Sequence, residues 1–454
     1  MASAHSPSTT SRPEVSIAAS PRNTLMYERV TIEVKGLMPG EAITLRTYFH
    51  DEGKKFESHA HYRSDVNGKV NTSKQGSEGG QYTGVEPMGL FWSMTACPNH
   101  KYGTRYMKND VTKPLLVNIT VHCGHLDSSQ CRHDVNPIAT TSVERWYMNT
   151  NVERFEVRAG RVRGTLLKPK GPGPFPAVID MFGGVRPGCN EIRAAPLATK
   201  GYVAFALAYF GGEGQPPKLE DTKCLEMEYF EEATDWLSRQ PYVQAGGIGT
   251  IGICKGGEMA LAMAIHFPEK IRATIAFSTA GIFNVCPTSY KGEFFPHAEY
   301  DLHHDNYQQM ATIMNQISFA PDGALITRDI SPDTKLLERY QKFEKIQCPA
   351  LIICGDHDGS VNWTNNGRII AEKIQTNGHN NDCELVVYPG GGHLIEPPQA
   401  PLCITSYQPP WGLIHWGGIP AQHAHVQDEA WTKMLAFLEH NLRCDSQSIP
   451  ASKL

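Results

Sequence analysis

The sequence predicts an α/β protein of two domains, in which a large domain of alternating strands and helices follows a smaller all-β domain. Three observations lead to this prediction. At 454 residues, the chain exceeds the size of one typical domain. From about residue 25 to residue 140, apolar and polar side chains alternate with the period of two that is typical of strands. From about residue 155, apolar runs of strand length alternate with segments of helix length.

The first region has the pattern of a small antiparallel sandwich. Residues 30–34 and 115–121 carry apolar side chains at every second position. Turn-forming pairs such as Pro39-Gly40 and Asn67-Gly68 separate such runs. One face of each strand is then buried and the other is wetted, as in a sandwich of two antiparallel sheets.

The second region has the pattern of a mainly parallel sheet. Strand-like apolar runs occur at residues 177–179, 203–207 and 248–253, and segments of helix length lie between them. Beyond the last run, Met259 and Met263 are four residues apart, as core residues of a helix are. Strands and helices in alternation predict a parallel sheet with helices on both faces.

These patterns divide the chain into four segments, with a linker expected near residues 144–157. The expected segments are a disordered start rich in Ser, Thr and Pro, the β-sandwich, the α/β domain and a polar C-terminal tail, at residues 1–24, 25–145, 155–444 and 445–454.

Composition excludes several classes of partner. A net charge of −5 and a pI near 6.4 provide no basic field for nucleic acid or for an anionic membrane surface. No apolar run approaches the roughly 20 residues that span a bilayer. Twelve cysteines are scattered without paired spacing, and the N-terminus lacks the apolar core of a secretory signal, so we expect reduced thiols. Small molecules are therefore the expected ligands, with no metal.

Residues 249–258, with the sequence GTIGICKGGE, match the nucleophile elbow G-x-nucleophile-x-G, with cysteine as the nucleophile. In this motif a buried strand turns sharply into a helix, and glycine flanks the nucleophile because larger side chains would clash. Gly252 and Gly256 occupy the flanking positions. The turn would raise the Cys254 sulfur above the sheet, and the backbone N–H of Lys255 would face an oxyanion.

Two later strands carry the other members of a catalytic triad. The run at residues 349–354 leads to Asp356 and Asp358, and the run at residues 384–388 leads to His393 in a glycine-rich loop. The carboxyl ends of parallel strands are where open α/β sheets place their active sites. Of the two acids we prefer Asp358. The resulting order of cysteine, acid and histidine is the chain order of α/β hydrolases.

A further loop is a candidate for the second half of an oxyanion hole. Phe182-Gly183-Gly184 follows a strand-like run, and in α/β hydrolases the loop after the third strand donates the second oxyanion N–H. Phe182 and Gly183 are therefore candidates, although these residues also fit an ordinary strand-to-helix turn.

Most other cysteines and histidines have a structural interpretation. We expect Cys189, Cys354 and Cys383 to be small buried side chains and His425 to be a surface or packing residue. The long segment 283–345 has no clear strand rhythm, and we expect it to form a roof over an acyl pocket.

The chain ends in Ser452-Lys453-Leu454, the tripeptide that the peroxisomal import receptor reads at a free C-terminus. The polar residues before it suit an accessible tail. We therefore expect the receptor as a partner and the peroxisome as the location, with the cytosol as the alternative.

Four longer motifs resemble those of the type I acyl-CoA thioesterases and the related bile acid-CoA:amino acid N-acyltransferases. They are GVEPMGLFW at residues 84–92, IDMFG at 179–183, YFEEA at 229–233 and GHLIEPP at 392–398. The resemblance extends over nearly the whole chain. It implies an N-terminal immunoglobulin-like sandwich, a C-terminal α/β-hydrolase domain, coenzyme A thioesters as substrates and no other cofactor.

The resemblance leaves the acyl acceptor open. The thioesterases of the family mostly carry serine as the nucleophile, whereas the bile-acid enzyme carries cysteine, as Cys254 does here. The following residues, Lys255 to Glu258, look instead like the thioesterase elbow. We expect a fatty acyl-CoA thioesterase, and the alternative is transfer of the acyl group to glycine or taurine. Dienelactone-hydrolase-like enzymes are a further rival but lack the sandwich, and a silent binding scaffold would have no use for a triad.

Overall fold

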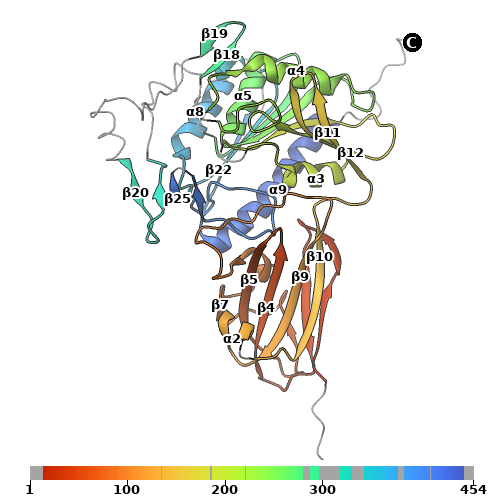
Figure 1. The fold of residues 1–454 in the computed structure, drawn as a ribbon, viewed down its shortest axis with the longest axis vertical. Helices are drawn as coiled ribbons and strands as arrows, with labels where there is room; N and C mark the ends of the chain where they lie inside the picture. Colours follow the sequence, from red (N-terminus) through yellow and green to blue (C-terminus); the bar gives the residue numbers. More distant parts are fainter. Residues whose placement is uncertain are drawn as a thin grey trace, which may run out of the picture.

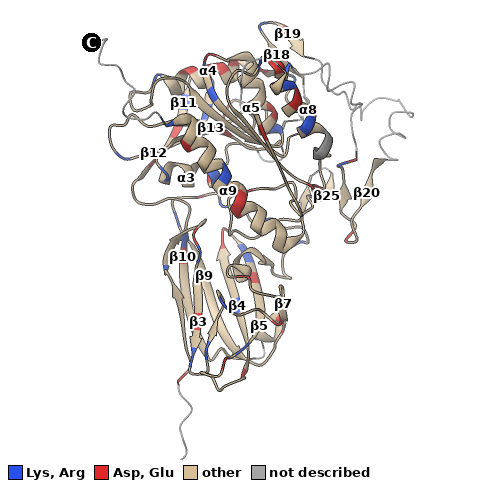
Figure 2. Ribbon diagram, turned by 180° about the vertical axis from the view of Figure 1, so that it is seen from behind, with Lys and Arg blue, Asp and Glu red and all other residues tan. Residues whose placement is uncertain are grey.

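The computed structural model describes residues 14–133, 135–184, 187–219, 221–279, 287–295, 316–329, 342–376, 383–409 and 411–443. It consists of an N-terminal β-rich domain and a C-terminal α/β domain, as predicted (Figure 1). Positively and negatively charged residues both occur in each domain (Figure 2). In the part of the chain that the structure describes, no helix has the length and apolar character needed to cross a membrane.

Two β-sheets build the N-terminal domain. The smaller has the order β1-β3-β6, formed by Ser16–Ser20, Thr31–Lys35 and Val70–Asn71. The larger has the order β2-β10-β9-β4-β5-β7, with β8 beside β5, formed by Asn23–Leu25, Ala139–Trp146, Leu115–Cys123, Ala42–Asp51, Lys54–Arg63, Gly79–Gly80 and Thr95–Ala96. Two short helices accompany them, α1 (Gly89–Trp92) and α2 (Ser128–His133).

The period-two pattern explains how these sheets pack. Alternate side chains such as Ile32 and Val34 of β3 and Ile43 and Leu45 of β4 are fully buried in one shared core. The intervening polar side chains lie on the opposite face of each strand, where Glu33 is partly exposed and Thr44 is buried. The apolar faces of the two sheets meet in the core.

The prediction of disorder for residues 1–24 is wrong from residue 16 onward. Residues 16–20 form β1, which pairs antiparallel with β3, and residues 23–25 form β2, which pairs parallel with β10. Ala19 and Met26 reach the interior. The Ser-, Thr- and Pro-rich composition of residues 1–24 did not indicate these strands. Their backbone hydrogen bonds pair with β3 and β10, so each forms the outer strand of a sheet. Residues 1–13 lie outside the described residues.

The C-terminal domain is built on an eight-stranded sheet with the order β11-β12-β14-β13-β16-β17-β22-β23. Its strands are Val152–Ala159, Val162–Pro169, Val203–Ala208, Ala177–Met181, Ile248–Ile253, Ile271–Phe277, Ala350–Gly355 and Cys383–Tyr388. The first three pair antiparallel, and from β14 onward all neighbours are parallel.

Helices cover both faces of this sheet, as the alternation of strands and helices predicts (Figure 1). On one face lie α4 (Met227–Ser238), α5 (Lys255–His266) and α8 (Trp363–Gln375). On the other lie α3 (Glu191–Thr199) and α9 (Pro420–Leu442). The central strands β14, β16 and β22 are therefore buried along their whole length.

The described parts of the segment 283–345 form two hairpins rather than a structureless roof. Strands β18 (Thr288–Tyr290) and β19 (Glu293–Phe295) extend β15 (Leu225–Glu226). The rings of Tyr290 and Phe295 pack on His266, at the end of α5 opposite to Cys254, so this hairpin does not cover the nucleophile.

The second hairpin of this segment lies beside the catalytic domain's last strands. Strands β20 (Ser318–Phe319) and β21 (Leu325–Ile326) join β25 (Gly412–His415) and β24 (Thr405–Gln408) in one sheet. A short 3₁₀ helix, Phe343–Lys345, leads into β22. Residues 280–286, 296–315 and 330–341 lie outside the described residues.

Polar contacts join the two domains. The Arg105 guanidinium pairs with the Glu396 carboxylate at 2.6 Å, and the His425 ring contacts Glu86 at 2.9 Å. Ala424 of α9 belongs to the core of the N-terminal domain. The backbone N–H of Leu402 also donates to the carbonyl of Trp92 at 2.9 Å.

Candidate active site

Cys254 lies in the sharp turn between β16 and α5. Its backbone has φ 56° and ψ −122°, a conformation that costs a non-glycine residue free energy and persists only where the surroundings impose it. The Cys254 N–H donates to the carbonyl of Phe277 on the neighbouring strand at 2.9 Å, and the Cys254 carbonyl accepts the N–H of Gly257 in the first turn of α5. The strand and the helix thus hold the residue from both sides.

The flanking glycines are required by close backbone contacts. A Cβ atom on Gly252 would lie 2.0 Å from the carbonyl oxygen of Gly256. A Cβ atom on Gly256 would lie 2.3 Å from the carbonyl oxygen of Met181 at the end of β13. Backbone atoms cannot move aside as a flexible side chain can, so the turn accepts no larger residue at either position.

Asp358 and His393 lie in direct contact at the carboxyl end of the sheet. The Nδ1 atom of His393 is 2.8 Å from Oδ2 of Asp358, and both side chains are only 1% exposed. The second carboxylate oxygen of Asp358 accepts the N–H groups of Ser360 at 2.7 Å and Val361 at 2.9 Å. The carboxylate is therefore fixed, and it orients the imidazole.

Asp356 has a different environment. Its Oδ1 atom accepts the N–H of Gly390 at 2.7 Å and contacts His357 Nδ1 at 2.7 Å. It thereby ties the loop after β22 to the loop after β23. Of the two acids, Asp358 contacts the imidazole of His393, whereas Asp356 contacts His357 and Gly390.

The charges around His393 favour its protonated form. Burial alone would lower the pKa of the imidazole. The carboxylate of Asp358, the sulfur of Cys254 and the hydrogen bonds that both make with the ring outweigh burial and raise the pKa to about 10. The ring thus bonds Asp358 on one side and the Cys254 sulfur on the other, which brings all three predicted side chains together.

The loop after β13 lies against the nucleophile. A Cβ atom on Gly183 would lie 3.1 Å from Cβ and 3.7 Å from Sγ of Cys254. The Tyr209 hydroxyl donates to the carbonyl of Phe182 at 2.5 Å. Because the N–H and C=O of one peptide point in opposite directions, this bond turns the Gly183 N–H away from Tyr209.

Buried ion pairs lie on both sides of Cys254, one in α5 and one at the end of β13. In the first turn of α5, the Lys255 ammonium lies 2.8 Å from the Glu258 carboxylate, and each side chain is 3% exposed. At the end of β13, the Arg193 guanidinium of α3 binds the Asp180 carboxylate and also donates to the carbonyl of Met181. These pairs fix the helix and the loop between which the sulfur lies.

Two residues that the sequence analysis missed hold His393 in place. The Nδ1 atom of His423 accepts the N–H of Gly392 at 3.0 Å, and its Nε2 lies 3.2 Å from the carbonyl of Leu394. His423 thus contacts the residues on both sides of His393. The ring of Trp416 stacks on that of His393, with centroids 5.4 Å apart. No local pattern marks either residue, because both reach the site from later segments of the chain.

His425 differs from its neighbour His423. It is 58% exposed on the same helix, as expected for a surface residue. Among the residues described, no group of three or more His, Cys, Asp or Glu side chains is arranged to hold a metal ion.

The fold and this site define an α/β hydrolase with a nucleophile elbow. Residues 27–159 match the family model described as acyl-CoA thioester hydrolase/BAAT N-terminal region, and residues 225–444 match the one described as BAAT/acyl-CoA thioester hydrolase C terminal. The chain belongs to this family of acyl-CoA thioesterases and bile acid-CoA:amino acid N-acyltransferases.

Relatives with both activities in their names are similar to the chain over nearly its full length. Human bile acid-CoA:amino acid N-acyltransferase is 35% identical over 96% of this chain and 99% of its own. Human acyl-coenzyme A thioesterase 1 is 36% identical over 93% of this chain and 96% of its own. Human mitochondrial acyl-coenzyme A thioesterase 2 is 36% identical over 93% of this chain and 83% of its own. The protein is thus an enzyme of the thioesterase or acyltransferase type.

Replacing Asp358 by Asn should remove the negative charge that raises the pKa of His393. The pKa of His393 should then fall, because burial opposes the charged ring and only the Cys254 sulfur still favours it. We expect kcat/KM for an acyl-CoA to fall by about 10³- to 10⁴-fold, as when the acid of a triad is neutralised. Asp356→Asn is the matched control and should retain activity within about tenfold. Equal losses in the two variants would contradict the assignment.

Burial lowers the pKa of His423 to about 4. Because the folded state disfavours protonation, His423 stabilises the fold above its unfolded pKa of about 6.5, and this contribution is lost as the pH falls toward 4. Urea denaturation should show a loss of unfolding free energy between pH 6.5 and 4 that is smaller, by up to about 3 kcal/mol, in His423→Gln. His425→Gln should behave as the wild type, and identical pH slopes in all three proteins would disprove this role.

Proposed function

We propose that the protein is a peroxisomal acyl-CoA thioesterase that hydrolyses fatty acyl-CoA to free fatty acid and coenzyme A through an acyl-enzyme on Cys254. The observation that carries the proposal is that His393 contacts both Asp358 and the Cys254 sulfur. Cys254 lies in a turn where close backbone contacts require glycine at positions 252 and 256. A cysteine so placed needs only an acyl donor to act as a nucleophile.

In the first half-reaction the proton shared by Cys254 and His393 lies on the imidazole, and the Cys254 thiolate attacks the thioester carbonyl. The Asp358 carboxylate stabilises the imidazolium. The N–H of Lys255 and an N–H from Phe182 or Gly183 donate to the oxyanion. The intermediate then collapses, coenzyme A leaves as a thiol with the proton from His393, and the acyl group remains on Cys254 as a thioester.

In the second half-reaction the acceptor decides the product. His393 takes a proton from water, which attacks the acyl-enzyme, and the fatty acid is released. Glycine or taurine in place of water would give an N-acyl amino acid, which is the alternative function. A thioester reacts with amines more readily, relative to water, than an oxygen ester does, so the cysteine favours this alternative.

The surroundings of the nucleophile favour hydrolysis. Lys255, Gly256, Gly257 and Glu258 resemble the elbow of the family's thioesterases, and the buried pair of Lys255 with Glu258 gives these residues a structural purpose. The peroxisome is proposed from Ser452-Lys453-Leu454, through the import receptor. These residues lie outside the described part of the chain.

Product analysis separates the two functions. We expect that incubation with a fatty acyl-CoA plus glycine or taurine, followed by mass spectrometry, yields mainly free fatty acid. A dominant N-acyl product would reverse the order of the two functions. Cys254→Ala should abolish both products, which serves as the control for uncatalysed reaction.

Replacing Cys254 by Ser should retain hydrolysis and weaken aminolysis. The acyl-enzyme becomes an oxygen ester, which discriminates less in favour of amines. The ratio of N-acyl amino acid to free acid, measured at several taurine concentrations, should fall in the variant. An unchanged ratio would mean that the sulfur does not influence the choice of acceptor.

A further inference from the structure

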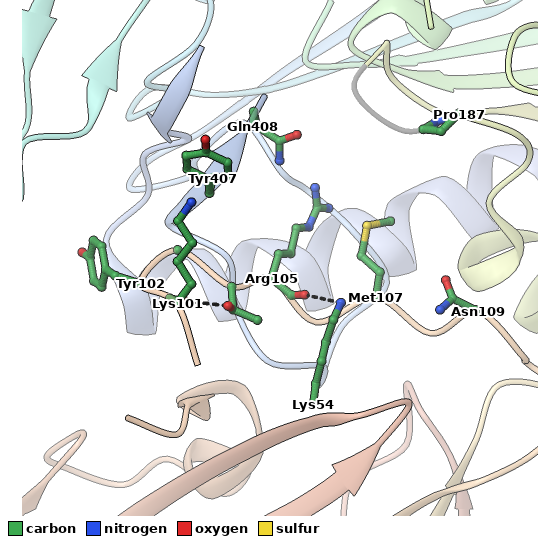
Figure 3. Close-up of a pocket in the computed structure, with 11 residues that line it drawn as sticks. Lys54, Lys101, Tyr102, Arg105, Met107, Asn109, Pro187, Tyr407 and Gln408 are labelled. Atoms are coloured by element: carbon green, nitrogen blue, oxygen red, sulfur yellow. Dashed lines mark hydrogen bonds between the residues drawn. The ribbon is translucent and has the colours of Figure 1, made fainter. Parts of the chain in front are cut away.

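A cavity of about 500 Å³ lies where the N-terminal domain meets the catalytic domain (Figure 3). Its walls come mainly from the segment 101–109, from Lys54 at the start of β5 and from Tyr407 and Gln408 on β24. Its volume falls within the range of 300 to 1,000 Å³ that is typical of small-molecule sites. None of its eleven lining residues is acidic, and three are cationic: Lys54, Lys101 and Arg105.

The cations are held in place by neighbouring groups. The Lys54 ammonium donates to the carbonyl of Arg105 at 3.0 Å, and the Lys101 ammonium lies 3.4 Å from the centroid of the Tyr407 ring (Figure 3). The Lys101 contact is with an aromatic ring and leaves the charge of the ammonium in place. The exposed Lys101 therefore contributes a positive charge to the wall of the cavity.

Arg105 is the innermost of the three. Its side chain is 7% exposed and is paired with Glu396 through one terminal nitrogen at 2.6 Å. The Glu396 carboxylate thus holds this guanidinium in place at the wall of the cavity.

The cavity adjoins the proposed oxyanion loop. The guanidinium carbon of Arg105 is 5.8 Å from the centroid of the Phe182 ring, and Pro187, further along the same loop, is another lining residue. Glu396, the partner of Arg105, follows His393 by three residues. A ligand in the cavity therefore lies beside the site without occupying the place of the sulfur.

We propose that this cavity binds the phosphorylated nucleotide of coenzyme A while the pantetheine arm carries the thioester to Cys254. The proposal rests on the acyl-CoA chemistry proposed above. Phosphate oxygens accept from Arg and Lys, and three cations suit a ligand with several phosphate charges. Tyr102, 60% exposed, and Tyr407, 41% exposed, provide aromatic surface for the adenine.

The other ligands of the reaction, the fatty acyl chain and the amino acid acceptor, fit the cavity less well. A fatty acyl chain would have to displace water from three cations without replacing their hydrogen bonds. Glycine or taurine carries a single anionic group and would leave most of this volume and two of the positive charges unused. The nucleotide matches the cavity in size and in charge.

The test compares two thioesters of the same acyl group, an acyl-CoA and an acyl-N-acetylcysteamine, which lacks the nucleotide. The exposed Lys101 is changed to Ala, to Glu and to Arg, and Lys69→Ala on a distant turn is the control. We expect Lys101→Ala to raise KM for the acyl-CoA about tenfold, equivalent to about 1.4 kcal/mol, and Lys101→Glu to raise it further. KM for the short thioester should not change, and Lys101→Arg should restore wild-type values.

Calorimetry with 3′,5′-ADP tests the cavity without turnover. The nucleotide should bind to the wild type and to Lys69→Ala, and Lys101→Glu should weaken binding at least tenfold. Taurine should not compete with it. Equal KM changes for both thioesters, or unchanged nucleotide binding in Lys101→Glu, would overturn the assignment of the cavity. If the wild type hydrolysed neither thioester yet still bound 3′,5′-ADP in this way, the proposed function alone would fail.

Discussion

The sharp turn between β16 and α5 is the constraint on which the rest of the site depends. There the backbone of Cys254 adopts a positive φ because a strand hydrogen bond and a helix turn hold it from opposite sides. Gly252 and Gly256 permit this turn because they have no Cβ atom. A Cβ at either position would lie within about 2 Å of a backbone carbonyl oxygen. A strained residue of this kind needs a rigid surrounding, and the buried pairs Lys255–Glu258 and Asp180–Arg193 provide it.

The imidazole is positioned in a complementary way, by many weak contacts from distant segments. Asp358 comes from the loop after β22, Trp416 from the segment after β25 and His423 from the beginning of α9. Each contact is an ordinary hydrogen bond or ring contact, but together they leave His393 one orientation. The charge of Asp358 then makes this buried ring basic, which a position in an apolar core alone would not do.

The features predictable from sequence are those encoded locally. The glycine spacing around Cys254 and the strand ends before Asp358 and His393 are short patterns, and the α/β fold follows from the alternation of strands and helices. His423, Trp416 and Arg105 carry no such signal, because their roles arise only when α9, β25 and the N-terminal domain return to the sheet. The same limit explains β1, a short strand next to a Ser-, Thr- and Pro-rich start, whose pairing with β3 becomes evident only in the folded sheet.

The hairpin of β24 and β25 makes the two domains a single functional unit. Near its start, the N–H of Tyr407 donates to the carbonyl of Gly103 in the N-terminal domain at 3.0 Å, and beyond its end the carbonyl of Trp416 accepts the N–H of His393 at 2.9 Å. The same hairpin segment thus bonds to the N-terminal domain and to His393. Removing the N-terminal domain would therefore also remove a backbone contact of the hairpin that supports the imidazole.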